Sequence, residues 1–162
     1  MSIVLIGPPA AGKSRVGRRL ARRLGLAYID TDAVIVRDHG AIAEIFASQG
    51  ESHFRMLERS AVEAALREHA VVSLGGGAVL DQRTQNELRG RAVVLLTIRP
   101  EAVAERIANG KRPLVHDLAS WQRLVDERTP LYRRLAAFTT DTTYRRVDDV
   151  VDEITHWAQE QS

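Results

Sequence analysis

Residues 7–14 read GPPAAGKS and fit the pattern GxxxxGKS of a phosphate-binding loop. This motif constrains the fold because it functions between a β-strand and a helix, where backbone N–H groups and the helix N-terminus face the same anion. The context agrees, since residues 3–6 form a short apolar run and residues 13–24 carry apolar side chains at helical spacing. We therefore expect an α/β domain that binds a nucleotide.

Two side chains of this loop have direct roles in the motif. Lys13 is expected to reach the β- and γ-phosphates, and the Ser14 hydroxyl is expected to bind Mg²⁺. Lys13 and Lys111 are the only lysines among the 23 basic residues, which argues against a plain Gly/Pro turn at this position. The residues expected to contact the nucleotide here are Gly7, Pro8, Pro9, Ala10, Ala11, Gly12, Lys13, Ser14 and Arg15.

Composition excludes several other classes of protein. The chain has no cysteine, which excludes a disulfide framework, a thiol catalyst and an iron–sulfur cluster. A balance of 23 basic to 21 acidic residues argues against a polybasic nucleic-acid binder. No apolar run reaches the ~18–20 residues of a membrane span, and the first residues do not read as a signal peptide. We expect one cytoplasmic, monomeric domain over 1–162, with neither nucleic acid nor membrane as partner.

Apolar runs and turn residues divide the chain into alternating strands and helices. Strands are expected at 3–6, 27–29, 71–74, 92–98 and 137–140. Helices are expected at 13–24, 33–68 with breaks near Gly40 and Gly50, 81–88, from Pro100, around Trp121, and 150–157. Continuous apolar strands are typical of a parallel sheet that helices cover on both faces. Functional residues of such sheets gather where the strands end.

Asp30-Thr31-Asp32 comes directly after the second expected strand. One of its carboxylates can hold the water shell of a magnesium ion, and the other can accept a proton from the hydroxyl of an acceptor substrate. Alternatively, Asp30 or Thr31 caps the helix that follows. The tripeptide alone leaves both interpretations open.

Two further features follow later strands. Gly75-Gly76-Gly77 ends the third expected strand, where glycine lets the backbone approach a ligand closely or simply makes a tight turn. Arg112 lies in a charged loop and suits an arginine that closes over the transferring phosphate. Because 21 residues are arginine, the assignment of Arg112 alone carries little weight.

Together these features resemble shikimate kinase, a family of small P-loop kinases related to the nucleoside monophosphate kinases. The resemblance covers nearly the whole chain and rests on GPPAAGKS at 7–14, DTD at 30–32, IFASQGESHFR at 45–55, SLGGGAV at 73–79, RPL at 112–114 and RTPLY at 128–132. It implies a three-layer α/β sandwich with a five-stranded parallel sheet in the order 2-3-1-4-5. It also implies a substrate-binding region at about 31–60 and a mobile lid at about 108–118.

The resemblance implies a chemistry as well: transfer of the γ-phosphoryl group of MgATP to the 3-hydroxyl of shikimate, in aromatic amino-acid biosynthesis. Asp32 matches the aspartate that binds the substrate hydroxyls and is the candidate base, and Asp30 matches the one beside the magnesium water shell. Arg55 and Arg128 match the pair that binds the substrate carboxylate. The other matches are Gly75, Gly76 and Gly77 as substrate contacts, Lys13 and Arg112 as catalytic residues, Arg112 and Arg145 as ATP contacts, and Phe46, Phe54 and Pro113 as ring contacts. Glu58, one turn after Arg55 on the same expected helix, is expected to orient that arginine.

The chain departs from the family pattern mainly in residues associated with adenine. Arg15 follows the loop serine where threonine is usual, Val147 replaces a common proline, and the segment 106–112 is about one residue short. These departures bear on the adenine contacts of Arg106 and Arg145. Two alternatives to a shikimate kinase are a kinase of gluconate or a nucleoside monophosphate, and a catalytically silent nucleotide-binding homologue.

Overall fold

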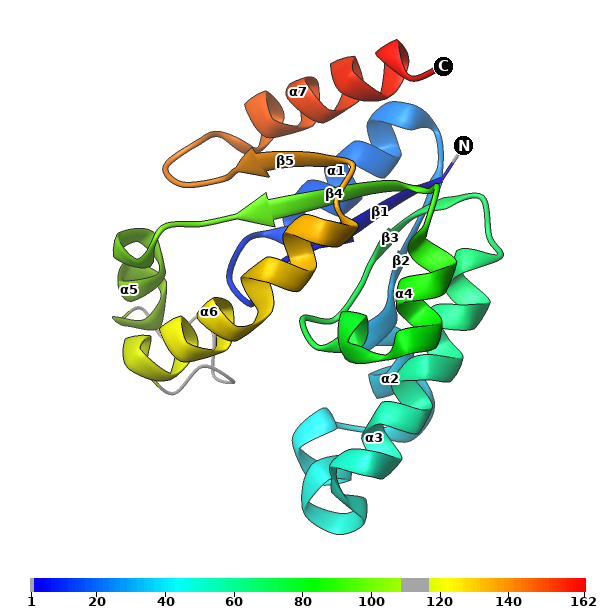
Figure 1. Cartoon of the computed structure of the whole chain (residues 1–162), viewed down its shortest axis with the longest axis vertical. Helices are drawn as coiled ribbons and strands as arrows, with labels where there is room; N and C mark the ends of the chain where they lie inside the picture. Colours follow the sequence, from blue (N-terminus) through cyan, green and yellow to red (C-terminus); the bar gives the residue numbers. More distant parts are fainter. Residues whose placement is uncertain (1, 109–116) are drawn as a thin grey trace.

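The structure is a computed structural model that describes residues 2–108 and 117–162. Its centre is a five-stranded parallel sheet in the order β2-β3-β1-β4-β5 (Figure 1). The strands are β1 (Ile3–Ile6), β2 (Ala27–Asp30), β3 (Ala70–Ser73), β4 (Ala92–Thr97) and β5 (Phe138–Asp141). The predicted fold class and strand order are therefore confirmed.

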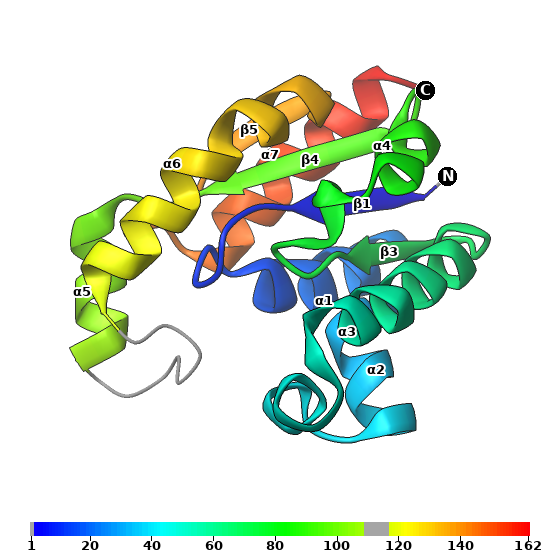
Figure 2. The ribbon, with the colours of Figure 1, turned by 60° about the horizontal axis from the view of Figure 1, so that its bottom comes forward.

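Side chains of the central strand point alternately into two apolar cores. Ile3 and Leu5 belong to the core beneath α1 (Lys13–Leu24) and α7 (Val147–Glu160). Val4 and Ile6 belong to the core on the other face, against α3 (Ile42–Leu66), α4 (Gln82–Leu88) and α6 (Leu118–Leu135). Figure 1 and Figure 2 show the two helical layers on either side of the sheet. Burial on both faces explains why β1 is apolar throughout.

A helical extension projects beyond the sheet, at the bottom of Figure 1. It consists of α2 (Thr31–His39) and the first turns of α3, around a small core of Ile35, Ile45 and Phe54. Gly50 interrupts α3 with a φ of 84°, which confirms the predicted break. The helix α2 begins at residue 31, two residues before the predicted start, because the Asp30 carboxylate caps its first turn.

The later helices lie near their predicted positions with different ends. The helix α5 (Pro100–Ala108) begins at Pro100 as predicted. The helix α6 runs through Pro130 to residue 135 and is longer than predicted, so the RTPLY segment at 128–132 is helical. A short 3₁₀ helix (Ala78–Leu80) connects the glycine run to α4. Among the described residues, no helix is long and apolar enough to cross a membrane.

Candidate active site

The phosphate-binding loop connects β1 to α1 at the carboxyl edge of the sheet. Gly12 is the N-cap residue of α1 and has a φ of 91°, a backbone conformation that glycine adopts without a steric penalty. In this fully described stretch, no side chain caps the helix and its first turn contains no acidic residue. The N–H groups and the positive end of the helix dipole therefore remain available to a bound anion.

Lys13 extends back over the loop. Its Nζ atom donates hydrogen bonds to the carbonyl oxygens of Gly7, at 2.6 Å, and Pro8, at 3.1 Å. The ammonium group thus lies within the turn that is expected to surround the phosphates. This position agrees with the role that the motif gives to Lys13.

Three loop carbonyls are held by side chains from distant parts of the chain. The indole N–H of Trp121 donates to the Pro9 carbonyl at 2.8 Å. The other two hydrogen bonds run from the Arg106 guanidinium to the Ala10 carbonyl and from the Thr142 hydroxyl to the Ala11 carbonyl. With their carbonyls engaged in this way, the peptide groups of the loop are fixed in orientation. Sequence analysis did not assign Trp121 or Thr142 to the site, and no local signal connects them to a loop more than 100 residues away.

Asp30 caps the following helix, and its other carboxylate oxygen contacts the phosphate-binding loop. Its Oδ1 atom accepts hydrogen bonds from the backbone N–H groups of Asp32, at 3.0 Å, and Ala33, at 3.2 Å, and so caps α2. Its Oδ2 atom accepts a hydrogen bond from the Ser14 hydroxyl at 3.0 Å. A hydroxyl and a carboxylate are hard oxygen ligands of the kind that suits Mg²⁺. The pair therefore fits the predicted metal position beside the loop.

Asp32 lies in the first turn of α2, two residues after the end of β2. The residue is half-buried, and its Oδ1 atom approaches Gly75 so closely that a Cβ atom on that glycine would be 2.6 Å away. Burial raises the pKa of the Asp32 carboxyl, and the charge of Asp30 raises it further, while Lys13 and Arg55 act against the rise. A carboxylate with a raised pKa is a better proton acceptor, as a general base requires.

The glycine run 75–77 faces the three side chains that were predicted to bind the substrate. A Cβ atom on the first glycine would meet Asp32, and one on the second would be 3.3 Å from Nη1 of Arg128. One on the third would be 2.6 Å from Nη1 of Arg55. The absence of side chains at 75–77 is therefore what allows a carboxylate from α2 and guanidinium groups from α3 and α6 to converge here.

Arg55 is oriented by the residue predicted for that purpose. Its Nη1 atom is 2.7 Å from Oε1 of Glu58, one turn further along α3, and its Nη2 atom is 3.4 Å from Oε1 of Glu51. Glu58 is buried, and this burial raises the pKa of its carboxyl, while the hydrogen bond from Arg55 opposes the rise. The Arg55 guanidinium is thus anchored on one side and half-buried.

Two buried side chains hold the glycine run in place, and sequence analysis gave neither of them this role. The Thr31 hydroxyl accepts a hydrogen bond from the backbone N–H of Gly75 at 3.2 Å. The Tyr132 hydroxyl donates to the carbonyl of Gly76 at 2.7 Å. Tyr132 lies four residues after Arg128 on α6, and this spacing on one helix face was the signal that could have revealed it.

The other residues predicted to contact the substrate or ATP lie in different parts of the fold. Phe54 is buried, and its ring centroid lies 4.8 Å from that of Phe46, which is 37% exposed. Arg145 lies between β5 and α7 and forms an ion pair of 2.7 Å with Glu153. Arg15 is exposed at the start of α1. Arg112, Pro113 and most of the predicted lid lie outside the described residues.

Comparison with known proteins places this geometry in a family. The family model described as Shikimate kinase matches residues 9–159. A shikimate kinase of Mycobacterium avium is 48% identical over 154 residues, which cover 91% of this chain and 88% of the relative. The relation thus extends over the loop, the helical extension and the glycine run together.

Comparison with solved structures gives the same family. Shikimate kinase from Acinetobacter baumannii, in complex with shikimate, has a TM-score of 0.91 and 31% identity, and the match covers 99% of this chain and 94% of that one. A gluconokinase from Sinorhizobium meliloti, with a TM-score of 0.66 and 23% identity over 99% of this chain and 94% of that one, shares the fold alone. The chain therefore belongs to the shikimate kinase family.

Proposed function

We propose that this chain transfers the γ-phosphoryl group of ATP to the 3-hydroxyl of shikimate, giving shikimate 3-phosphate and ADP. The observation that carries the proposal is the convergence of Asp32, Arg55 and Arg128 on the glycine run 75–77. A carboxylate and two guanidinium groups in one place suit a substrate that has both hydroxyl groups and a carboxylate. The phosphate-binding loop follows β1, and the glycine run follows β3, which pairs with β1. The loop and the glycine run therefore lie side by side at the carboxyl edge of the sheet.

On the nucleotide side, positive charge and backbone N–H groups stabilise the phosphates. The loop amides and the α1 dipole surround the anion, and Lys13 exchanges its carbonyl acceptors for phosphate oxygens. Ser14 would bind Mg²⁺ directly and Asp30 would bind it through water, and the ion would neutralise part of the charge on the phosphates. Arg112 is assigned by family resemblance to the lid, where its guanidinium would meet the charge that develops on the transferring group.

On the acceptor side, Arg55 and Arg128 bind the substrate carboxylate through their planar N–H forks. Glu58 holds Arg55 in position, and the carbonyl of Gly76 is held in turn by Tyr132. With the ring fixed at its carboxylate end, the 3-hydroxyl is directed toward Asp32. Fixed geometry of this kind is a major source of rate in phosphoryl transfer.

Asp32 serves as the base in the transfer itself. The 3-oxygen of shikimate forms the new bond to the γ-phosphorus, and the bond from that phosphorus to the β–γ bridging oxygen breaks. The hydroxyl proton passes to the Asp32 carboxylate, and the electron pair of the broken bond leaves with ADP. Because the pKa of Asp32 is raised by burial, its carboxylate accepts this proton more readily than an exposed aspartate.

The experiment that tests the proposal is ADP release from ATP and Mg²⁺ with shikimate, gluconate or a nucleoside monophosphate as acceptor. We expect shikimate to stimulate release far more than the other acceptors. Lys13→Ala is the control and should abolish release with every acceptor, because the phosphates lose their stabilising charge. Equal stimulation by gluconate or a nucleotide would contradict the proposed acceptor and leave the phosphate-binding loop unaffected.

A further inference from the structure

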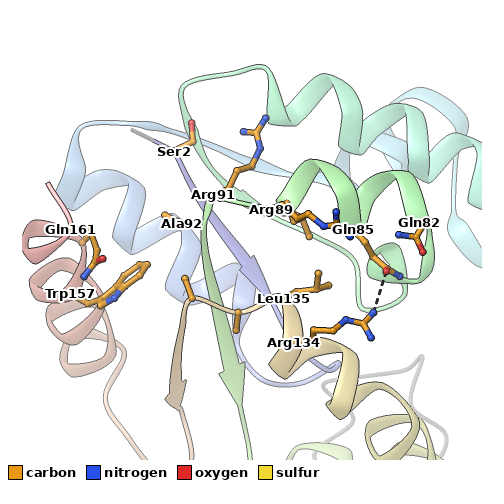
Figure 3. Close-up of a pocket in the computed structure, with 15 residues that line it drawn as sticks. Ser2, Gln82, Gln85, Arg89, Arg91, Ala92, Arg134, Leu135, Trp157 and Gln161 are labelled. Atoms are coloured by element: carbon orange, nitrogen blue, oxygen red, sulfur yellow. Dashed lines mark hydrogen bonds between the residues drawn. The ribbon is translucent and has the colours of Figure 1, made fainter.

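A large cavity lies at the edge of the sheet opposite the active site (Figure 3). Its volume is about 1120 Å³, and it opens where β4 and β5 begin. Ala92, the first residue of β4, and Ala137, just before β5, line it together with residues of α4, α6 and α7. The active-site segments follow the other ends of the strands, at least a strand length of roughly 13 Å away. The cavity is therefore separate from the kinase site.

Positive charge gathers around this cavity. Arg89, Arg91 and Arg134 line it, and none of its lining residues is acidic. Within residues 2–108 and 117–162, none of these three guanidinium groups forms an ion pair. The carboxylate of Glu87, on α4, is bound to Arg59 at 2.9 Å. The other polar side chains at the cavity are the neutral amides Gln82, Gln85 and Gln161 and the Ser2 hydroxyl.

The arginines retain most of their hydrogen-bonding capacity. Arg91 donates from Nε to the Glu87 carbonyl at 2.8 Å and from Nη1 to the Leu66 carbonyl at 3.0 Å, so backbone atoms hold it. Arg134 donates from Nη2 to Oε1 of Gln85 at 3.4 Å. A guanidinium group has five N–H donors. The cavity therefore offers a ligand several N–H donors and positive charge that, among the described residues, no ion pair engages.

An aromatic ring lines the opposite side of the cavity. The Trp157 ring is stacked on Phe138, with centroids 5.0 Å apart and planes at 13°, which fixes the orientation of the indole. Figure 3 shows Trp157 and Gln161 across the cavity from Arg134. Leu135, next to Arg134, extends the apolar lining. The surface thus combines cations on one side with an aromatic wall on the other.

We propose that this cavity binds a small organic anion, whose carboxylate or phosphate group is held by Arg89 and Arg134 and whose apolar body lies against Trp157. Guanidinium forks match both anions through charge-assisted hydrogen bonds. The volume is close to the range of small-molecule sites, roughly 300–1000 Å³.

The two tryptophans of the chain make the test specific. The indole N–H of Trp157 reports the cavity, whereas that of Trp121 is bonded to the phosphate-binding loop. Full-length protein labelled with ¹⁵N-tryptophan is titrated with benzoate, phenyl phosphate and the uncharged benzamide, and Trp157→Phe assigns the two indole signals. We expect a saturable shift of the Trp157 signal with one or both anions and none with benzamide, and the two anions distinguish a carboxylate site from a phosphate site.

A variant pair then tests the arginines. In R89Q/R134Q the anion affinity read from the Trp157 signal should fall about tenfold or more, the scale of a lost charge-assisted hydrogen bond. R37Q/R99Q removes two exposed arginine charges at the carboxyl edge of the sheet, on α2 and after β4, and should leave that affinity unchanged. An unchanged Trp121 signal shows that each variant is folded, and R89Q alone replaces the double variant if that one does not fold. A shift of Trp121 alone, an equal response to benzamide, no response to either anion, or undiminished affinity in R89Q/R134Q would overturn the proposal.

Discussion

Asp32 lies among charges of both signs: the carboxylate of Asp30 raises the pKa of Asp32, and the cations Lys13 and Arg55 lower it. Its half-buried carboxylate lies against the backbone of Gly75, where a substrate hydroxyl can approach closely. Asp32 has both a raised pKa and a position close enough to Lys13 of the phosphate-binding loop to feel its charge. We therefore propose that the chemical step depends on Asp32, and its binding role can be separated from its role as a base.

Asp32→Asn keeps the shape of the side chain and its ability to accept a hydrogen bond, but removes the base and the charge. We expect MgATP to bind normally, shikimate to bind somewhat more weakly, and turnover to fall by ~10²-fold or more, the scale of lost general-base catalysis. Nucleotide affinity, shikimate affinity and turnover are measured on one preparation. Near-normal turnover would contradict the role of Asp32 as base, and a loss confined to nucleotide binding would place it at the metal instead.

The same substitution should change how stability depends on pH. Because the pKa of Asp32 is raised in the folded protein, the folded state binds this proton more tightly than the unfolded state, and stability from this group is lost as pH rises through the folded pKa. Asp32→Asn removes that loss, so the variant should have the higher free energy of unfolding at pH 8 and a smaller advantage near pH 4, close to the ordinary aspartate pKa of about 3.9. Urea unfolding at both pH values measures this difference. An advantage of equal size at the two pH values, or a less stable variant at pH 8, contradicts the burial argument.

Arg55 and Arg128 should be sensitive to the geometry of their head groups. Arg→Lys at either position keeps the charge and loses the planar fork, so shikimate affinity should fall by roughly tenfold to 150-fold, the range for a lost charge-assisted hydrogen bond. Equilibrium binding of shikimate measures the effect. Arg19→Lys is the matched control, because Arg19 is an exposed residue of α1 paired with Asp148. Unchanged affinity in the Arg55 or Arg128 variant would make that arginine an ordinary surface residue.

At the scale of elements, the glycine run allows α2, α3 and α6 to bring their side chains together. Gly77→Ala places a Cβ atom 2.6 Å from the end of the flexible Arg55 side chain, which can move while the backbone stays. We expect the shikimate KM to rise about tenfold, with nucleotide affinity and the unfolding midpoint little changed. Gly76→Ala is the comparison and should have a smaller effect, because its Cβ atom would be 3.3 Å from Nη1 of Arg128. An equal effect of the two substitutions, or none, would show that Arg55 is not positioned by this close approach.

The elements themselves could largely be predicted, because each depends on local signals. A continuous apolar run identified β1, a glycine marked the break at Gly50, and Pro100 marked the start of α5. The predictions were wrong where capping or tertiary packing extends an element. The Asp30 carboxylate starts α2 early, and α6 continues through Pro130, whose neighbour Tyr132 is buried against the sheet. For α2 the cap was one of the two interpretations that the sequence left open, whereas for α6 the pattern does not contain the packing partner that decides its end.

At the scale of the whole molecule, the site depends on contacts that span the chain. The phosphate-binding loop could be predicted from eight consecutive residues, and family resemblance supplied Asp32 and the two arginines. The supports of the loop could not be predicted, because Trp121 reaches Pro9 and Thr142 reaches Ala11 only after the sheet has assembled. The cationic cavity at the opposite edge is likewise formed by residues of several elements that no motif connects.

We propose that phosphate from ATP is transferred to the 3-hydroxyl of shikimate at this site. The most direct test is ³¹P NMR of a reaction mixture of protein, ATP, Mg²⁺ and shikimate, with Lys13→Ala as the inactive control. We predict a new phosphate monoester signal, coupled to the proton at carbon 3 of the shikimate ring, that grows in step with ADP and is absent from the control. Release of inorganic phosphate without a monoester, or a monoester at another hydroxyl, would contradict the account.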